Sequence, residues 1–253
     1  TSTVQYSGNN PTVTRTGYHH LLIDSDTNTV VATAPAASLQ VFGDLTIGVA
    51  TTSSLNVTTN DPILSVIGDV YIGANGTLLA SDSSYAQFTG SYDNDGVFTA
   101  NGGEVRFANA SGTATVAAGS SSFATLTFNG AGDFLVSENA TATEALSITG
   151  VGGFTLQANE NVAVGGPFSN TSGSVTTWSS TTLVLYGGDA YTVNTKTGSD
   201  TYHDVTVTGN THPRFWNSSF NSVSTNGTSS LYSMDHDDTA GDLYIFGDYV
   251  NSS

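Results

Sequence analysis

A nine-residue phrase that occurs twice in the first third of the chain limits the possible folds more than any other feature. QVFGDLTIG occupies residues 40–48, and SVIGDVYIG follows 25 positions later, at residues 65–73. Both copies lie within a longer repeat of about 78 residues, so that one copy is an insertion. A fold that can gain 25 residues inside a repeat is built from small, equivalent pieces.

The longer repeat connects phrases that are far apart in the chain. GVFTANGGEVRF at 96–107 aligns with GSVTTWSSTTLVL at 173–185, and FATLTFNG at 123–130 aligns with YHDVTVTG at 202–209. A similar phrase, YHHLLI, starts at Tyr18. We therefore predict that Tyr18, Phe123 and Tyr202 hold one position of the unit. The extra residues between Tyr18 and Phe123 are then the duplicated piece.

Short apolar phrases with a period of two run along the whole chain. Typical pairs are Leu45 with Ile47 and Leu126 with Phe128, each with Thr between the apolar residues. This period predicts strands, and the Gly, Asn, Asp and Ser residues between the phrases predict turns. No stretch of about ten residues combines a helical period with caps, so we expect almost no helix.

Two all-β architectures accommodate a repeat of this length. Immunoglobulin-like sandwiches are of similar size, but inserting a third of the unit would break their sheet pairing. In a β-solenoid the same insertion adds one coil and only lengthens the stack. We therefore predict an all-β fold, a parallel β-helix (β-solenoid) of about ten coils, with about three coils in each repeat. Residues 1–253 form one domain, with the extra coil near residues 43–73. Tandem β-sandwiches are the alternative.

Charge and composition exclude several classes of partner. The chain has 4 Lys and Arg residues against 21 Asp and Glu residues, a formal net charge of -17. Nucleic acids and anionic lipids are bound by clusters of Lys and Arg, which this chain lacks. No apolar run reaches the roughly 20 residues of a membrane helix, so we expect no membrane insertion. The polar, lysine-poor composition favours an extracellular or cell-surface location.

The succession V-x-F-x-G, TV, aromatic-x-x-Leu-x-Ile/Phe and GDLTIG resembles the Thr/Gly/Asn-rich β-solenoid repeats of large secreted surface proteins of bacteria and archaea. Those proteins are adhesin-like or autotransporter-passenger-like. The resemblance covers nearly the whole chain, through loose motifs. It implies a right-handed parallel β-helix and a role as a stalk, filament or adhesin, and it carries over no site residues.

Both ends of the predicted solenoid lack a cap. Strand phrases run from the first residues to the last, and neither end offers an amphipathic helix. An uncovered end exposes backbone groups and apolar residues. We therefore expect identical subunits to stack head to tail into an extracellular filament or cell-surface assembly. The predicted contact residues are Val4, Tyr6, Leu243, Ile245 and Tyr249. A window cut from a longer repetitive chain and a capped monomer are the alternatives.

Two other functions compete with stacking. The first is a surface adhesin or glycan-binding stalk that uses exposed aromatic residues such as Trp178, Phe215 and Trp216, although core packing is their simpler role. The second, more remote, is a polysaccharide-degrading β-helix enzyme. Lyases need Lys or Arg beside clustered acids and hydrolases need a pair of acids across a groove, and neither pattern stands out. We therefore expect no enzymatic activity.

Acidic turns are candidate calcium sites, because they place carboxylates at alternate loop positions. Solvated turn residues are the simpler interpretation. The best candidate ligands are Asp235, Asp237, Asp238 and Asp242. A weaker set is Asp24, Asp26 and Asn28, which lacks the glycine and the closing glutamate of an EF-hand loop.

Asn-x-Ser/Thr sequences are candidate glycosylation sites, although so many are close to the number that chance predicts in this composition. Turn positions are expected to be exposed and available. The candidates are Asn75, Asn109, Asn226, Asn56 and Asn139. His19 and His203 follow the repeated aromatic residue, which favours packing or exposure over catalysis.

Overall fold

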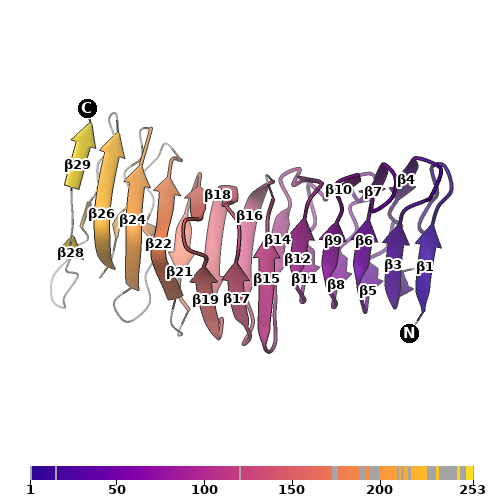
Figure 1. The fold of residues 1–253 in the computed structure, drawn as a ribbon, viewed down its shortest axis with the longest axis horizontal. Coiled ribbons are helices and arrows are strands. Elements are labelled where there is room, and N and C mark those ends of the chain that lie inside the picture. The colour runs from indigo at the N-terminus through magenta and orange to yellow at the C-terminus, as the bar shows by residue number, and fades with distance from the viewer. Residues whose placement is uncertain are drawn as a thin grey trace.

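A computed structural model of the chain describes residues 2–14, 16–119, 121–172, 176–187, 192–193, 200–209, 211, 214–215, 218–226, 232–233, 244–245 and 249–252. Within these residues every regular element is a β-strand, and the strands pair in parallel. Figure 1 shows them stacked along one long axis, from β1 (Thr3–Tyr6) at one end to β29 (Tyr249–Ser252) at the other. The predicted all-β parallel β-helix is confirmed.

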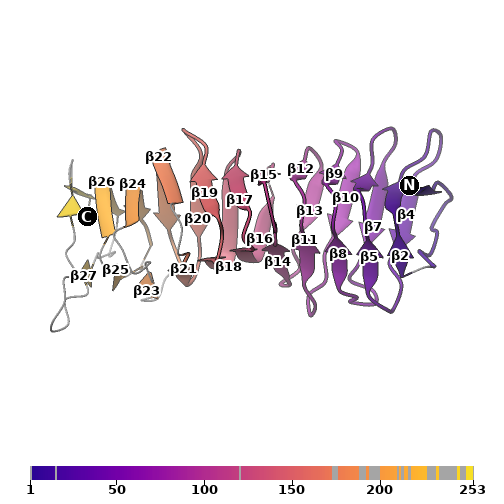
Figure 2. The same cartoon turned by 90° about the horizontal axis from the view of Figure 1, so that it is seen from below.

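The pairings place the strands on three faces, which Figure 2 shows from another side. The first face contains β1, β3 (His20–Ile23), β6 (Leu45–Ile47), β9 (Val70–Ile72), β12 (Tyr92–Asn94), β15 (Thr113–Ala117), β17 (Asp133–Val136), β19 (Gly153–Leu156) and the beginning of β22 (Thr176–Leu185). The second begins with β4 (Val30–Thr33), β7 (Ser53–Asn56), β10 (Gly76–Leu79) and β13 (Val97–Thr99). The third begins with β2 (Gly17–Tyr18), β5 (Leu39–Val41), β8 (Leu64–Val66), β11 (Ala86–Phe88) and β14 (Glu104–Phe107).

Several strands in the second half of the chain are longer, because one strand bends from one face to the next. The register of β16 (Ser122–Asn129) against β18 (Ala140–Thr149) shifts between Phe123 and Thr125. The same happens between Trp178 and Thr182, where β22 pairs with β24 (Asp200–Val207). The ladders continue through β20 (Asn161–Val164), β21 (Phe168–Asn170), β23 (Thr192–Val193), β25 (Arg214–Phe215), β26 (Ser218–Asn226), β27 (Tyr232–Ser233), β28 (Tyr244–Ile245) and β29.

The coils follow one another in close register. On the first face eight strands stack from β1 to β19, and the parallel pairing continues through β22, β24 and β26. The predicted number of about ten coils differs little from this. In the duplicated phrase Gln40 pairs with Ser65 and Leu45 pairs with Val70, so the two copies are neighbouring coils.

The repeated aromatic residues are all buried, but they lie on different faces. Tyr18, Phe123 and Tyr202 are each at most 3% exposed. Tyr18 pairs with Val41 on the third face, whereas Tyr202 pairs with Trp178, which extends the first face. Phe123 lies before the bend of β16. The shared phrase therefore marks a strand and its turn, and not one fixed position of the coil.

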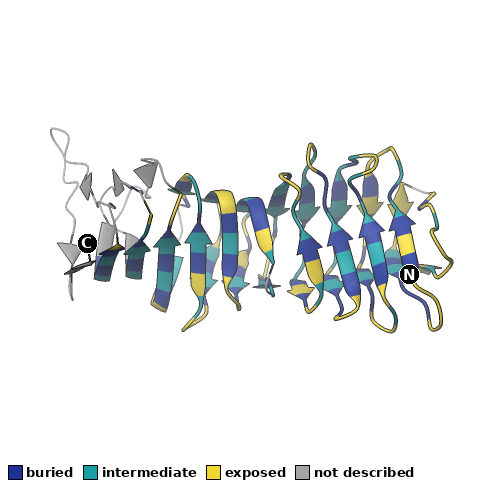
Figure 3. Ribbon diagram, turned by 90° about the horizontal axis from the view of Figure 1, so that it is seen from above, coloured by how far each residue is buried: buried dark blue, intermediate teal, exposed yellow. Residues whose placement is uncertain are grey.

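Interior positions repeat from coil to coil, because alternate residues of each strand point inward. Leu21, Leu45 and Val70 form one such ladder, and each is at most 1% exposed. Figure 3 shows the resulting bands of buried and more exposed residues along the strands. From Phe88 to Phe220 the interior contains a continuous column of aromatic rings, with neighbouring ring centroids 5.1–6.3 Å apart.

Candidate functional site: the open first coil

In the part of the chain that the structure describes, no strand pairs with the outer edge of β1. Among the described residues β1 pairs with β3 alone, and it is the outermost strand at its end in Figure 1. Val4 and Tyr6 pack against the core but are only half-buried. Their partners one coil further, Leu21 and Ile23, are 1% and 0% exposed. The first rung of the apolar ladder is therefore covered on one side only.

The hydrogen bonds of β1 show which of its backbone groups point outward. The N–H of His20 donates to the carbonyl of Ser2 at 3.1 Å, and the N–H of Asp24 donates to that of Tyr6 at 3.2 Å. The backbone N–H and C=O groups of the even-numbered residues of β1 therefore point toward β3. Because the direction alternates in a parallel ladder, the N–H and C=O groups of Thr3 and Gln5 point to the open edge.

The rest of the first coil is held firmly in place. Thr12 forms a parallel bridge with Thr33, and β2 pairs with β5. Inside the coil the hydroxyl groups of Tyr6 and Tyr18 lie 2.6 Å apart, and the Tyr6 hydroxyl also accepts the N–H of Thr14 at 3.1 Å. Tyr6 thus covers part of the interior while leaving the strand edge free, so the open edge is an ordered surface.

The opposite end is described through its backbone. Ile245, in β28, pairs with Phe220, and Tyr249, in β29, pairs with Val223, so both predicted contact residues lie on the last strands of the stack. Leu243 lies outside the described residues. Within the described part of the chain no strand follows β28 or β29 on the outer side.

The predicted calcium residues do not form a site among the described residues. Asp24 is 6% exposed, and its carboxylate accepts the N–H groups of Ala50 at 2.8 Å and Thr51 at 3.1 Å. Burial opposes its ionisation, but these backbone hydrogen bonds outweigh burial and lower the pKa of Asp24. It braces two coils, whereas Asp26 and Asn28 are exposed.

The stronger calcium candidates, Asp235, Asp237, Asp238 and Asp242, lie outside the described residues. Within the part that the structure describes, no three or more His, Cys, Asp or Glu side chains gather as metal ligands would. Calcium binding at the four aspartates stays a prediction.

The predicted glycosylation sites differ in accessibility. Asn75, Asn139 and Asn226 are exposed and Asn56 is half-buried, so these remain candidates. The expectation that Asn109 is exposed is wrong. Asn109 is 6% exposed, and its Nδ2 donates to the carbonyls of Gly112 at 2.9 Å and Asp133 at 3.1 Å, because the turn uses its amide as an internal brace.

The aromatic candidates for sugar stacking do not form a surface platform in the described residues. Trp178 is 2% exposed and packs on Tyr202, with ring centroids 5.1 Å apart, so it belongs to the core. Only the backbone of Phe215 is described, and Trp216 lies outside the described residues. The buried position of Trp178 is therefore incompatible with the stacking of sugars on its ring.

A row of polar side chains at one corner links successive coils, and sequence reasoning missed it. Nδ1 of His20 accepts the N–H of Asp44 at 2.9 Å, and Oδ1 of Asp44 accepts that of Asp69 at 3.0 Å. Asp69 accepts the N–H of Ser91 at 2.8 Å, and Ser91 accepts that of Thr115 at 3.1 Å. The Gly-Asp pair shared by both copies of the duplicated phrase is the signal that could have predicted this row.

Comparison of the chain with protein-family models, with curated proteins and with solved structures finds no match. Among the described residues there is no helix of the length and apolarity needed to cross a membrane. The function must therefore be argued from the geometry of the solenoid itself, and above all from its ends.

Proposed function

We propose that the protein is a structural subunit of an extracellular filament or cell-surface assembly, and that it polymerises by head-to-tail stacking of its solenoid ends. One observation carries this proposal: among the described residues no strand pairs with the outer edge of β1, where Val4 and Tyr6 are half-buried while Leu21 and Ile23 on the next strand are fully buried. A further strand on that edge would complete the ladder.

Strand addition would use forces that already hold the coils together. The outward N–H and C=O groups of Thr3 and Gln5 would pair with a neighbouring strand, as in other cases of β-strand addition. Covering Val4 and Tyr6 would bury apolar surface, worth about 25 cal/mol for each Å². The two ends are different surfaces at opposite ends of one long axis, so stacking in line along that axis would produce a linear polymer.

The proposal is tested by blocking the outward N–H of β1 alone. In Gln5→Pro the ring removes an N–H that points away from β3, a position where an edge strand tolerates proline. Gln5→Ala is the matched control, because both variants lose the hydrogen bond from Gln5 Nε2 to the Asp24 carbonyl at 3.0 Å but only the proline loses the N–H. We expect concentration-dependent growth of light scattering for the wild type and Gln5→Ala, and its loss in Gln5→Pro.

Negative-stain microscopy of the same samples should show fibres where scattering grows, and circular dichroism should show the same strand content in all three proteins. A wild-type protein that stays monomeric at every concentration, or a folded Gln5→Pro variant that grows like the control, contradicts head-to-tail stacking through this edge. The proposed role requires no catalytic activity, and the absence of activity stays a prediction.

A further inference from the structure

One peptide bond of the chain has both the residues and the surroundings that favour its cleavage from within. Of the five prolines only Pro62 follows an aspartate. Asp61 and Pro62 lie in the turn between β7 and β8, at the corner where the chain passes from the second face to the third. A carboxyl oxygen of aspartate can close a small ring on its own carbonyl carbon, so covalent bonds hold the reacting groups together. Proline supplies a tertiary amide, whose nitrogen accepts a proton more readily as it leaves.

The backbone at this bond is strained. Asp61 has a φ of 47°, in the left-handed region that few residues other than glycine adopt, and a residue before proline prefers extended backbone. The turn imposes this conformation, since the N–H of Asp61 donates to the Val57 carbonyl at 3.0 Å and Pro62 is buried. Because cleavage frees Asp61 from this conformation, it would release the strain.

Two serines of the next coil contact the reacting groups. Ser84 Oγ donates to the carbonyl oxygen of Asp61 at 2.6 Å. That oxygen gains negative charge when its carbon is attacked, and a donor already in place stabilises the charge. Ser81 Oγ donates to Oδ1 of the Asp61 carboxyl group at 2.9 Å, whereas Oδ2 accepts no hydrogen bond from the described residues. One carboxyl oxygen is thus anchored and the other is left for attack.

The serines are themselves fixed by the turn that carries them. Ser81 is 3% exposed, and its Oγ accepts the N–H groups of Ser83 at 3.1 Å and Ser84 at 2.8 Å. The two hydroxyl donors therefore stand in position before any reaction begins, which is the condition under which such donors are most effective.

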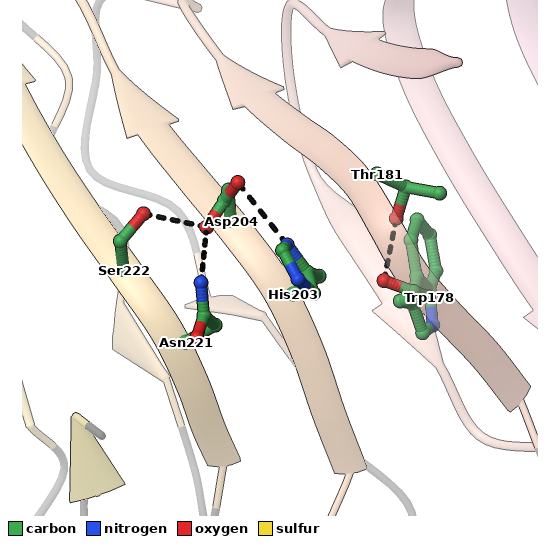
Figure 4. A network of polar contacts seen from close by, with 6 residues as sticks. All are labelled: Trp178, Thr181, His203, Asp204, Asn221 and Ser222. Atoms are coloured by element: carbon green, nitrogen blue, oxygen red, sulfur yellow. Dashed lines mark hydrogen bonds and ion pairs between the residues drawn. The ribbon is translucent and has the colours of Figure 1, made fainter. Parts of the chain in front are cut away.

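Two other places in the molecule lack part of this arrangement. Asn10, before Pro11, has a φ of 51°, but its side chain is an amide and no described residue donates to its carbonyl. Asp204 also accepts a hydrogen bond from a serine, Ser222 at 2.5 Å (Figure 4), but it lies within β24 and is followed by Val205. Strain, acid, proline and a donor to the carbonyl coincide at Asp61 alone among these three.

We propose that the folded chain cleaves itself between Asp61 and Pro62. One carboxyl oxygen of Asp61 bonds to the residue's own carbonyl carbon, the bond from that carbon to the Pro62 nitrogen breaks, and the carboxyl proton passes to the nitrogen. The cyclic anhydride that results takes up a water molecule and opens to a free C-terminal aspartate. The event occurs once in each chain and does not depend on stacking.

The cut would leave the solenoid in one piece. Residues 1–61 and 62–253 stay joined by the parallel pairing of β5 with β8, β6 with β9 and β7 with β10. The product would be a nicked solenoid with two new chain ends at one corner. It should run as one species in native size-exclusion chromatography and as two in a denaturing gel.

The test compares the folded full chain with the same chain unfolded in urea, in one mildly acidic buffer in which circular dichroism shows the fold intact. Denaturing gels and mass spectrometry should identify fragments 1–61 and 62–253. The folded chain should be cleaved at least about tenfold faster, because the strain and the Ser84 donor exist only in the fold.

Three variants separate the contributions. Asp61→Gly keeps the positive φ without the carboxyl group and should abolish cleavage. Ser84→Ala should slow cleavage at least about tenfold, because it removes the donor to the carbonyl oxygen. Ser83→Ala, at an exposed neighbour in the same turn, is the matched control and should be cleaved at the wild-type rate.

Three outcomes overturn the proposal. The folded chain stays intact or is cleaved no faster than the unfolded chain, the Asn10–Pro11 bond is cleaved as readily as the Asp61–Pro62 bond, or a folded Ser84→Ala protein is cleaved at the wild-type rate. If Ser84→Ala fails to fold, Ser84→Cys replaces it, because a thiol fills the same place and donates only weakly. Light scattering of Asp61→Gly should equal that of the wild type, which separates self-cleavage from stacking.

Discussion

Asp24 is a buried carboxylate that fastens one coil to the next. Its oxygen atoms accept the N–H groups of Ala50 and Thr51, and Ser53 Oγ lies within 3.4 Å. A carboxylate held by main-chain donors in this way has a lowered pKa and stabilises the fold while it is ionised. The residue therefore acts as a structural brace.

Replacing Asp24 by alanine should lower the free energy of unfolding by about 1–3 kcal/mol at pH 7, because the main-chain N–H groups of Ala50 and Thr51 lose their acceptor. The folded-state pKa is depressed, so this stabilisation is present above the unfolded pKa of about 3.9 and is lost as the pH falls through the folded value. Urea denaturation at neutral and acidic pH measures both effects. Asp26→Ala, at an exposed neighbour, is the control, and equal losses in both variants at pH 7 would contradict the assignment.

Sequence patterns identify such turn residues without revealing what they face. Asp24 and Asn109 look like surface ligands or glycan acceptors, because Asp and Asn are common in exposed turns. In a solenoid the turn of the next coil lies directly above, and its backbone groups can occupy these side chains. Which turn residues serve as braces depends on the vertical register, and a single sequence does not specify that register.

The turn between β6 and β7 is an element whose geometry admits only glycine. Gly48 has a φ of 66°, and a Cβ atom there would lie 2.2 Å from the Cα of Gly76 in the next coil. Left-handed backbone and close approach between coils therefore act at the same position. The neighbouring turns are packed in a similar way, since a Cβ on Gly73 would lie 2.6 Å from the carbonyl oxygen of Gly48.

Gly48→Ala should lower the free energy of unfolding by more than about 2 kcal/mol, because strain at positive φ adds to a clash with main chain that cannot move freely. Gly8→Ala is the control, since a Cβ there has nothing within 4 Å, and it should change stability by about 0.5 kcal/mol or less. Thermal unfolding followed by circular dichroism distinguishes the two. A Gly48→Ala protein as stable as the Gly8→Ala control would be incompatible with the packing of these turns.

Strands and coils were predictable from the sequence to different degrees. The period of two identifies the strands, and the duplicated phrase identifies the coil, because both depend on local spacing. The faces were not predictable, since β16, β22 and β24 bend from one face to another within a single strand. Tyr18, Phe123 and Tyr202 share a local phrase but not a face for this reason.

At the scale of the whole molecule, charge should control assembly. Each subunit has a formal net charge of -17, so two subunits repel one another at low ionic strength. The Debye length falls from about 30 Å at 0.01 M to about 8 Å at 0.15 M salt. Stacking by backbone pairing and apolar contact should therefore proceed faster at the higher salt concentration, as measured by the rate of increase in light scattering. A rate that falls with added salt would instead indicate attraction between charged ends.

The hydrogen bonds of the corner row that begins at His20 all run in one direction along the solenoid axis. Each acceptor side chain bonds to the N–H of the coil that follows it in the chain, and the strands all run the same way. A rod made of such subunits would be polar. Its two tips would expose different groups and would elongate at different rates. If one tip were tethered to a surface, every rod in the layer would point its opposite tip outward.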